Sequence, residues 1–438
     1  MAELAEKSKV MEGIVNRFNS LNTSSDFHKN RKEAMDLLNT IGLPSPKNEE
    51  YKFTNITKIL EKEFNSIPHQ FNSKIQKEAI QKLDIEGLDV HKLVFINGVY
   101  SSELSDKIDI KGVTVKNIQQ AIEENDESLN KYFGKAAKSN RDAFLALNTA
   151  LTEDGALIHV SDNIVVEKPI ALYFINDSSE STVYSNSRNL VIAGKSSQAN
   201  FLEFFLTEGN ESSFSNIASE VVIDENAHIG YYRVQNNKET AYQVGTTQVH
   251  QSRSSVFSAY TFTLNGAIIR NNLNVTVDGE GCETNMYGLY LINGKTHVDN
   301  HTAVDHVQPH CESNELYKGI LEDTAKGVFN GKVFVRKEAQ KTNAFQSNKN
   351  ILLSDTAVVN TKPQLEIWAD DVKCSHGCTT GQLDEDALFY LRSRGLSKDS
   401  SRALLLYAFA IEVLETVKLD PLKNFLENLI SERLHKDF

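Results

Sequence analysis

Two thiols and an imidazole stand within five consecutive positions near the carboxyl end of the chain, at Cys374, His376 and Cys378. Apolar and polar residues alternate before this stretch as on a β-strand, and a helical pattern begins after it at Leu383. Spacings of two residues along a strand place all three side chains on one face. Thiolate and imidazole bind zinc, iron and iron–sulfur clusters. These groups do not fill a tetrahedral site, so either a second chain supplies the rest or the thiols are buried beside a hydrogen-bonded histidine.

A second group of such residues lies upstream. Four imidazoles and a thiol fall within fifteen positions of a chain that has 12 histidines in total: His297, His301, His306, His310 and Cys311. The H-E-x-x-H signature of helical zinc sites is absent, and strand alternation puts His301 and His306 on opposite faces. We therefore expect turn and core histidines here, with an all-protein metal site as the alternative.

No pattern in the sequence points to nucleotide hydrolysis or to acid–base catalysis. Residues 327–333 resemble a phosphate-binding loop only loosely, because the segment is one residue short between its glycines and lacks a hydroxyl residue after Lys332. Serine, histidine and aspartate are too numerous for spacing alone to single out a catalytic triad. Spacing therefore gives no candidate catalytic residue.

The composition favours a protein of a reducing compartment. The chain has 438 residues, 40% of them hydrophobic, which is enough for one large domain with smaller ends. A formal net charge of -13 argues against nucleic acid as a partner, because phosphate binding requires a basic face. Four cysteines are too few for a disulfide framework. We read no signal peptide, and the longest apolar run, 403–411, is too short to span a membrane, so we expect a cytoplasmic protein.

The elements that must position these groups fall into three regions. Residues 1–150 are expected to be mostly helical, with a polar linker near 44–54 and one strand at 91–100 that carries an Asn-Gly turn. In residues 151–382, short strands rich in Val, Ile, Phe and Tyr are separated by Gly, Asn, Asp and Ser. Residues 383–438 are expected to be helical.

An internal repeat marks the middle region. A small residue after a polar turn, followed by strand alternation, recurs at intervals of 28, 28 and 27 residues at Ala199, Ala227, Ser255 and Cys282, and less regularly at Ala325, Ala357 and Val372. No helices of useful length lie between these strands. The spacing favours a solenoid, most of all a parallel β-helix, over the alternative of an antiparallel sandwich. A solenoid has open ends, so we expect a cap or a partner at its last coil, where Cys374 and His376 stand.

Three helices are expected after the last strand. Asp384 can cap the first, Ser397 starts the second, and Asp420 with Pro421 starts the third. The second carries an apolar stripe of Leu404, Tyr407, Ala408, Ile411 and Leu414, and the third carries one of Leu422, Phe425, Leu426 and Leu429. Either these stripes pack on one another or they dock another subunit.

The chain resembles a known family over residues 44 to the end. The segment 370–377, Asp-Asp-Val-Lys-Cys-Ser-His-Gly, is similar to the carboxyl-terminal signature of the SufD branch of the SufB/SufD family of iron–sulfur cluster assembly proteins. The likeness extends through 381–385 and 388–395. Upstream, residues 309–321 resemble a motif shared by both branches, and 47–54 resemble the SufD amino-terminal region.

The resemblance implies a fold and two partners. It implies a right-handed parallel β-helix core between amino- and carboxyl-terminal helical parts. It implies a heterodimer with a SufB-like paralogue, joined through the β-helix ends. It also implies that the helices of residues 383–438 dock the ATPase SufC, which would carry out nucleotide hydrolysis for a chain that is itself not an enzyme. Whether the chain pairs with itself when SufB is absent stays open.

The resemblance also assigns site residues. SufB-like chains carry a cysteine where this chain has Ile367, so this chain lacks the thiol that the family uses to build the cluster. The histidine matching His376 lies at the SufB interface as a partner of that thiol, and Cys374 matches the neighbouring family cysteine. A small residue is expected at Cys378, which leaves its role open. No tightly bound cofactor is implied, only a transient iron–sulfur cluster or iron shared with SufB, whose sulfur and iron donors the sequence does not indicate.

Two other functions are compatible with a β-helix. One is an enzyme acting on polysaccharide, which requires an exposed groove lined by carboxylates and basic residues. No such constellation is visible in the sequence. The other is a purely structural partner subunit in which His376 and Cys374 only pack. Loss of cluster formation in a His376→Ala variant separates the scaffold with a ligand from the purely structural subunit.

Overall fold

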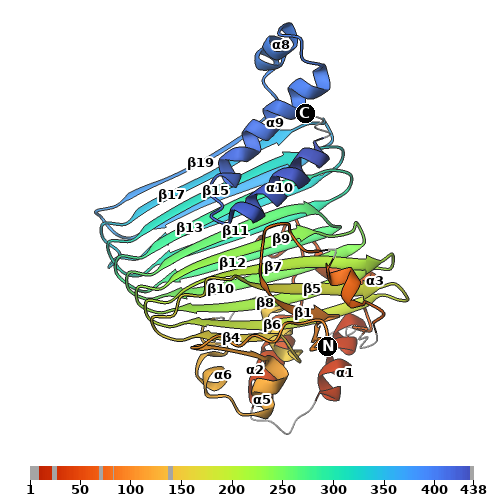
Figure 1. The fold of residues 1–438 in the computed structure, drawn as a ribbon, viewed down its shortest axis with the longest axis vertical. Coiled ribbons are helices and arrows are strands. Elements are labelled where there is room, and N and C mark those ends of the chain that lie inside the picture. The colour runs from red at the N-terminus through yellow and green to blue at the C-terminus, as the bar shows by residue number, and fades with distance from the viewer. Residues whose placement is uncertain (1–8, 22–26, 69–72, 82, 137–141, 435–438) are drawn as a thin grey trace, which may run out of the picture.

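A computed structural model of the chain describes residues 9–21, 27–68, 73–81, 83–136 and 142–434. Its strands stack one above another along the molecule, with helices at both ends of the chain (Figure 1). From β4 onward, consecutive strands alternate between two sheets, so each turn of the chain adds one strand to each sheet. Neighbouring strands of these turns run parallel. The fold is therefore the parallel β-solenoid that the repeat predicted, and the antiparallel sandwich is excluded.

The two sheets of the described residues differ from a plain stack only at their first strands. Sheet A has the order β19-β17-β15-β13-β11-β9-β7-β5-β1-β2, and sheet B has the order β18-β16-β14-β12-β10-β8-β6-β4-β3. The pairs β1–β2 and β3–β4 are antiparallel. The strand predicted at 91–100 is the hairpin β1–β2 with its turn at Asn97 and Gly98, and β1 pairs in parallel with β5. The strands of sheet A are β1 (His91–Ile96), β2 (Val99–Tyr100), β5 (Ile170–Ser178), β7 (Gln198–Gly209), β9 (His228–Asn236), β11 (Val256–Asn265), β13 (Glu283–Ile292), β15 (Glu312–Leu321), β17 (Asn343–Leu352) and β19 (Lys373–Gly381), and those of sheet B are β3 (Val113–Asn117), β4 (Ala156–Val160), β6 (Val183–Ala193), β8 (Ser213–Ile223), β10 (Ala241–Gln251), β12 (Ile268–Val277), β14 (His297–His306), β16 (Lys326–Val335) and β18 (Val358–Ile367).

One corner of each coil repeats a two-residue signature. A residue with a left-handed backbone precedes a small buried residue, as Asn226 (φ 56°) precedes Ala227 and Ser254 (φ 56°) precedes Ser255. The carbonyl of the small residue accepts a hydrogen bond from the first strand residue of the next coil, as that of Ala227 does from the N–H of Val256 at 2.9 Å. The left-handed residue makes the sharp turn, and the small residue lets neighbouring coils stack closely.

The register of these corners corrects the predicted repeat. Ser197, and not Ala199, lies in line with Ala227, because His228 bonds to the carbonyl of Ser197. Ala199 is also small and faces the interior, and a period of two makes residues two apart indistinguishable by pattern. Ala325 and Ala357 belong to the corner before sheet B, since they precede β16 and β18. The corner column before sheet A is Ser197, Ala227, Ser255, Cys282, Cys311, Thr342 and Val372, at intervals of 27 to 31 residues.

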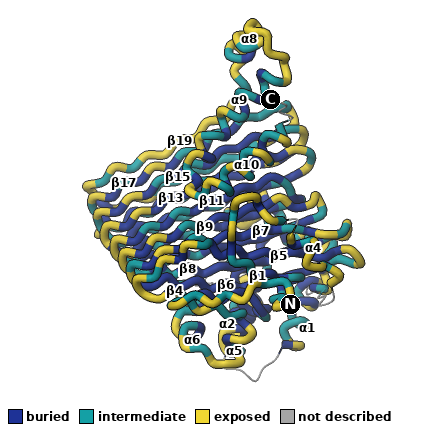
Figure 2. The backbone as a smooth tube through the Cα atoms, viewed as in Figure 1, coloured by how far each residue is buried: buried dark blue, intermediate teal, exposed yellow. Residues whose placement is uncertain are grey.

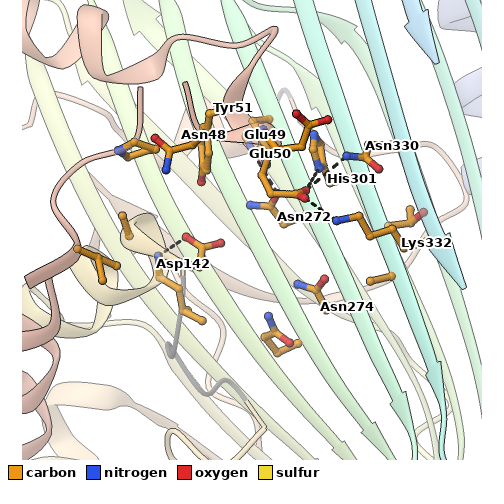
Figure 3. Close-up of a pocket in the computed structure, with 18 of the residues that line it drawn as sticks. Asn48, Glu49, Glu50, Tyr51, Asp142, Asn272, Asn274, His301, Asn330 and Lys332 are labelled. Atoms are coloured by element: carbon orange, nitrogen blue, oxygen red, sulfur yellow. Dashed lines mark hydrogen bonds and ion pairs between the residues drawn. The ribbon is translucent and has the colours of Figure 1, made fainter. Parts of the chain in front are cut away.

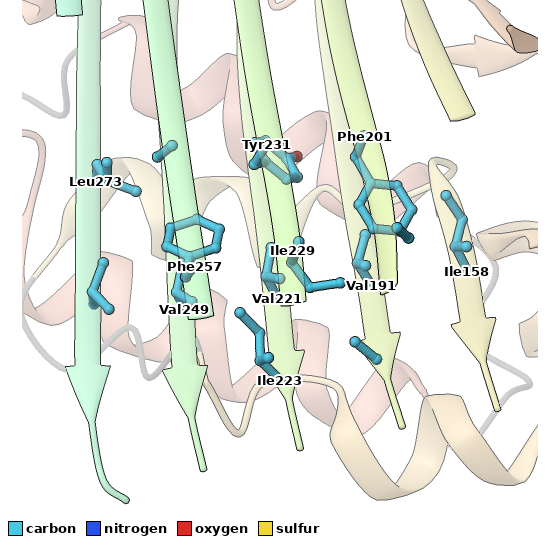
Figure 4. Close-up of a cluster of buried hydrophobic side chains, with 14 of the residues drawn as sticks. Ile158, Val191, Phe201, Val221, Ile223, Ile229, Tyr231, Val249, Phe257 and Leu273 are labelled. Atoms are coloured by element: carbon cyan, nitrogen blue, oxygen red, sulfur yellow. The ribbon is translucent and has the colours of Figure 1, made fainter. Parts of the chain in front are cut away.

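The interior between the two sheets is a packed apolar core in the first coils. Figure 4 shows Phe201, Tyr231 and Phe257 of sheet A among the aliphatic side chains of sheet B. Aromatic rings of adjacent coils stack, as Phe174 does on Phe205 with ring centroids 5.3 Å apart. Burying a side chain of this size contributes about 1.5–3 kcal/mol. Because every coil repeats such contacts with its neighbours, the stack forms the rigid body on which the other elements are placed.

Helices from the first third of the chain cover the outer face of sheet B. Leu38 and Phe144 belong to one buried cluster with Phe214 and Val244, which project outward from β8 and β10. Alternation along these strands therefore buries both faces of the sheet. The elements are α1 (Lys9–Ser20), α2 (His28–Ile41), the short 3-10 helix η1 (Glu49–Tyr51), α3 (Ile56–Glu63), α4 (Lys77–Gln81), α5 (Ile118–Glu123), α6 (Glu127–Tyr132) and α7 (Ala143–Ala150).

The carboxyl-terminal helices cover the outer face of sheet A. They begin where the sequence predicted, because the side chains of Asp384 and Ser397 cap the first two and Pro421 follows the first residue of the third. In Figure 1, α9 and α10 lie across sheet A, whereas α8 stands clear of both sheets. No helix in the described ranges is long and apolar enough to cross a membrane. The three helices are α8 (Glu385–Ser393), α9 (Lys398–Leu414) and α10 (Asp420–Arg433).

The face by which α9 packs on the sheet differs from the predicted stripe. Leu406, Ala410 and Val413 are buried against sheet A, whereas Leu404 and Tyr407 of the predicted stripe are only partly covered. Ala408 is exposed, Ile411 is partly covered, and Leu414 alone of the predicted stripe is buried. The pattern failed because apolar residues occupy most of the circumference of α9, so no single stripe stands out. In α10 the predicted Leu422 and Leu426 are buried, and Phe425 and Leu429 are partly buried against the same cluster.

The two ends of the solenoid are finished differently. At the amino-terminal end, β2 and β3 pair antiparallel with β1 and β4. At the carboxyl-terminal end, β18 and β19 each have a neighbouring strand on one side only, and no described residue pairs with the other side. Burial falls sharply in this last coil, whose outer strand is drawn mostly as exposed in Figure 2. The end that the sequence analysis expected to meet a cap or a partner is thus uncovered within the described residues.

Candidate functional site

The three chemistry-bearing residues of the opening stretch lie together on the last strand. In the register of β19 with β17, Cys374 pairs with Ala344, His376 with Gln346 and Cys378 with Asn348. The β17 residues of these pairs are buried and face the interior. Their β19 neighbours therefore share the inward direction, which agrees with the prediction from a spacing of two.

A second line of inward residues faces them from sheet B. Thr361 and Leu365 of β18 pair with Phe329 and Val333 of β16, both of which lie in the interior. We call the resulting uncovered surface the open mouth. It consists of Thr361, Pro363, Leu365 and Ile367 of β18 and of Cys374, His376, Cys378 and Thr380 of β19.

Exposure within the open mouth is uneven. Cys374 is half-buried beside Ala344 and Leu365, and burial raises the pKa of its thiol. His376 and Cys378 are exposed, and Cys378 accepts a hydrogen bond from the hydroxyl of Thr361 at 3.4 Å. Within the described parts of the chain, no three His, Cys, Asp or Glu residues converge on a position that could hold a metal ion. A ligand set at the open mouth therefore requires donors from elsewhere, as the sequence argument stated.

The floor of the open mouth is polar. Gln346, 3% exposed, lies directly beneath His376 in the register, and its Nε2 donates a hydrogen bond to Oε2 of Glu315 at 2.8 Å. Glu315 is itself one strand further in, in register with Gln346. Burial raises the pKa of Glu315 to about 7. The sequence analysis missed both residues, although stepping one coil back from His376 would have found the first of them.

The rim of the open mouth carries backbone edges and apolar side chains. The outer edges of β18 and β19 present unpaired peptide groups to any strand laid against them. Near them, Ile367, Trp368, Val358 and Phe345 are exposed, Trp368 by 49%. Peptide edges beside exposed apolar groups are the features of a surface that pairs with another chain by strand addition.

The upstream histidines do not form one cluster. His301 faces outward from β14, where its ring lies 3.3 Å from Oε2 of Glu50, whereas His306 faces inward and contacts the hydroxyl of Ser313 at 2.9 Å. Strand alternation separates these two side chains as predicted. Burial lowers the pKa of His306 to about 4. His297 contacts the hydroxyl of Thr54 at 3.0 Å.

His310 and Cys311 occupy the corner of a coil. His310 is the left-handed residue (φ 59°), and Cys311 is the small buried residue after it. The Cys311 thiol donates to the carbonyl of Gly279 at 3.1 Å, and the Cys282 thiol of the preceding coil donates to the carbonyl of Ser252 at 3.0 Å. The spacing of these two cysteines thus follows from the stacking of corners.

A polar pocket lies where the linker crosses the outer face of sheet B. Its volume is about 580 Å³, and it contains Glu50, His301 and Lys332 (Figure 3). Nζ of Lys332 lies 2.5 Å from Oε1 of Glu50. Beneath them, Arg270 pairs with Asp299 at 2.8 Å and donates to the backbone carbonyl of Glu50 at 2.7 Å. This network holds the linker against the solenoid.

The carboxylates of this pocket are committed to these ion pairs. The hydrogen bond with His301, opposed by burial and supported by Lys332, lowers the pKa of Glu50 to about 2. Although burial opposes it, His301 and Arg270 lower the pKa of Asp299 below its ordinary range. Asp142 caps α7 by accepting from the N–H groups of Phe144 and Leu145. A glycosidase needs a carboxylic acid that is protonated near neutral pH, and these three carboxyl groups do not provide one.

Comparison with known proteins decides the family. A model described as the SUF system FeS cluster assembly, SufBD core domain, matches residues 173–409, and one described as the SufBD protein N-terminal region matches residues 17–172. The first match covers more than half of the chain. The chain belongs to the SufB/SufD family. Its membership assigns it a role in iron–sulfur cluster assembly.

Members of the SufB/SufD family match the chain over nearly its whole length. An iron–sulfur cluster assembly SufBD family protein of Synechocystis is 33% identical over 414 residues, 92% of this chain and 90% of that protein. The iron–sulfur cluster assembly protein SufD of Escherichia coli is 28% identical over 408 residues, 92% of each chain. SufD of Bacillus subtilis is 26% identical over 401 residues, 90% of this chain and 91% of that protein. These relatives agree with the SufD-like resemblance of the carboxyl-terminal signature.

Proposed function

We propose that the chain is a scaffold subunit for iron–sulfur cluster assembly that has no active site of its own. It pairs through the open mouth with a SufB-like paralogue and through its carboxyl-terminal helices with an ABC-type ATPase of the SufC kind. His376, with Cys374 beside it, contributes to a cluster-building site shared with the paralogue. The observation that carries this proposal is the uncovered last coil, which presents those two residues between two free strand edges.

The open mouth suits a partner that is itself a β-helix. Two parallel strand edges and an uncovered apolar lining, including Leu365 and Ile367, match the end of a second solenoid, which offers the same two features. Pairing the edges would satisfy their peptide groups, and closing the two interiors would remove the lining from water. A paralogue of the same family has this architecture.

The residues of the open mouth suit a transient cargo better than a resident cofactor. A thiol and an imidazole are donors for iron, but with no third donor among the described groups they would hold it only together with ligands from the partner. Ile367 stands at the end of the opposite line, where it can offer only apolar contact. We therefore assign iron or the nascent cluster to the interface and not to this chain alone. The four free thiols suit a reducing compartment such as the cytoplasm.

The ATPase is assigned to the surface of α8 and the outer face of α9. Phe389 is 73% exposed and Tyr390 is 56% exposed, on a helix that stands clear of the sheets. Leu404, Tyr407 and Ile411 continue this apolar surface along the side of α9 that does not face sheet A. Exposed aromatic groups beside aliphatic ones are typical anchors of protein interfaces.

The test is co-purification followed by anaerobic reconstitution. The chain is expressed with a SufB-like and a SufC-like partner from its own genome, the ternary complex is isolated, and the cluster is measured by its absorbance. His376→Ala is compared with Ser375→Ala, which removes a side chain from the other face of the same strand. We expect intact complexes for both variants and a strongly reduced cluster only for His376→Ala.

Other outcomes separate the alternatives. A full cluster yield with His376→Ala and with Cys374→Ala reduces this chain to a purely structural partner subunit. Failure to form any complex overturns the proposal altogether. Size-exclusion chromatography of the isolated chain shows in the same experiment whether it pairs with itself when the paralogue is absent.

A further inference from the structure

We propose that Gln346 is a positioning residue for His376: the amide oxygen of Gln346 accepts a hydrogen bond from the His376 ring, and Glu315 holds the amide in the orientation that allows it. The inference deepens the proposed function and rests on it for its biological meaning. Its structural part, the orientation of one imidazole, can be tested by itself.

The three residues form a column that runs through three coils. Glu315 of β15, Gln346 of β17 and His376 of β19 are in register, so neighbouring side chains are about 4.8 Å apart at their origins. All three face the interior, the first two are buried, and His376 stands at the open mouth. Opposite Gln346 is Gly331 of β16, where a Cβ would lie 2.3 Å from Nε2 of Gln346. The missing side chain of Gly331 gives the amide its space.

The hydrogen bond to Glu315 fixes which end of the amide faces outward. Nε2 of Gln346 donates to Oε2 of Glu315 at 2.8 Å. An ionised carboxylate can only accept, so it selects the NH₂ end of the amide. Nitrogen and oxygen lie on opposite sides of a planar amide, and the oxygen is thereby turned away from Glu315, toward the strand that carries His376.

That oxygen is buried and has no hydrogen-bond partner among the described residues. A buried acceptor without a partner costs about 1–3 kcal/mol, so native structures keep such groups satisfied. The neighbour that the register supplies on the open side is His376, whose ring carries an N–H within reach of a stacked side chain. A hydrogen bond between them removes the cost.

The bond would also decide the chemistry of His376. A neutral imidazole carries its proton on one nitrogen, and the nitrogen without it is the one that ligates metal. If the nitrogen that faces Gln346 holds the proton, the other nitrogen presents its lone pair away from the floor, toward the partner. Histidines that ligate metal are commonly oriented through a carbonyl or carboxylate in this way.

The experiment measures the tautomer of His376 in the full-length chain. The protein is labelled with ¹⁵N-histidine, and the resonances of His376 are assigned by their loss in His376→Gln. We expect one tautomer to dominate in the wild-type protein and a mixture to replace it in Gln346→Met, which keeps the volume but removes both polar groups. Asn348→Met is the matched control, because Asn348 is equally buried in the next column, beneath Cys378, and should leave the His376 tautomer unchanged.

A swapped variant tests the chain of hydrogen bonds without emptying it. In Glu315→Gln combined with Gln346→Glu, the amide at 315 donates to a carboxylate at 346, which still accepts from His376. This double variant should restore the single tautomer, and it keeps the test valid if Gln346→Met fails to fold. A mixed tautomer in the wild type, or a single tautomer that persists in Gln346→Met, overturns the proposal.

The reconstituted complex separates this inference from the proposed function. Gln346→Met should lower the cluster yield while leaving capture of the paralogue intact, and the swapped variant should recover it. If the tautomer responds as expected but His376→Ala leaves the cluster unchanged, the proposed function fails and the positioning stands. If His376→Ala abolishes the cluster and the tautomer ignores Gln346, the positioning fails and the function stands.

Discussion

Thr361 and Cys378 join the two strands of the last coil across the open mouth, with the hydroxyl of Thr361 donating to the thiol of Cys378 at 3.4 Å. The contact lies at the surface, where both residues are accessible to solvent. Cys374, only four residues earlier, sits deeper between Ala344 and Leu365. The two thiols of the opening stretch therefore differ in access although they share a face.

This difference predicts the order in which the thiols react. Cys378 should be alkylated by iodoacetamide first, Cys374 more slowly because burial raises the pKa of its thiol, and the buried Cys282 and Cys311 last. Timed quenching and peptide mass spectrometry of the native chain give the rates. Equal rates for Cys374 and Cys378 would mean that the mouth is more open than described, and unfolding in urea should make all four rates similar.

The buried carboxyl group of Glu315 predicts a specific pH dependence of stability. Its folded-state pKa of about 7 lies above that of an unfolded glutamate, so between about pH 4 and 7 the folded state binds more protons than the unfolded state. The contribution of this group to the free energy of unfolding therefore falls as pH rises, by roughly 3 kcal/mol in total.

Glu315→Gln should remove that fall. Urea unfolding at several values between pH 4 and 8 gives the free energy of unfolding for the wild-type protein and the variant, and their difference should grow in favour of the variant toward pH 8. Glu312→Gln, which changes an exposed residue of the same strand, is the control. A difference that does not change with pH would show that Glu315 keeps an ordinary pKa.

The buried pair of Arg270 and Asp299 predicts how the linker is held. Asp299→Ala leaves the Arg270 guanidinium buried without its carboxylate, which should lower the free energy of unfolding by about 3–5 kcal/mol. Since Arg270 also holds the carbonyl of Glu50 and lies 4.0 Å from the centroid of the Tyr51 ring, the linker should become sensitive to protease in the same variant. Glu49→Ala breaks only the exposed pair with Lys362 and should cost less than about 1 kcal/mol.

The exposed helix α8 predicts a variant that loses the ATPase and nothing else. Phe389→Ala should weaken binding of the SufC-like partner by about 2 kcal/mol, or roughly 30-fold, because exposed aromatic anchors dominate interfaces. Thermal unfolding of the isolated chain should not change. Phe53→Ala removes a comparably accessible aromatic side chain from the linker and serves as control. Titration of the partner by calorimetry measures both, and equal affinities would move the docking surface away from α8.

Pattern predicted the solenoid but not the phase of its coils. The alternation and the turn residues were sufficient to predict parallel stacking, because no helices separate the strands. The phase failed at Ala199, where the interior accepts a small residue two positions from the corner as readily as at Ser197. Only backbone pairing between coils distinguishes those positions, and that pairing is not encoded in any single strand.

The site was predictable in its outer layer and not in its floor. Cys374 and His376 stood out because thiols and imidazoles are rare and were spaced by two. Gln346 and Glu315 are common residue types, and they gain their meaning from register across 30 and 31 residues, between β19 and β17 and between β17 and β15. The outward face of α9 was likewise ambiguous, since the sequence does not say which side of an apolar helix meets the sheet.

The position of α9 has a consequence for how the molecule can change in evolution. The helix has 17 residues and is about 25 Å long, the width of about five strands. At its two ends it is fastened to different coils, with Glu412 paired to Lys349 of β17 and the carbonyl of Thr416 bonded to Tyr260 of β11.

Such a helix is a gauge of fixed length laid along a stack that could otherwise gain or lose whole turns. Adding one coil between β11 and β17 would move one fastening by a full strand spacing and leave the other behind. Growth of the protein is therefore confined to its loops and to the coils below the helix, and the distance from α9 to the open mouth is conserved by construction.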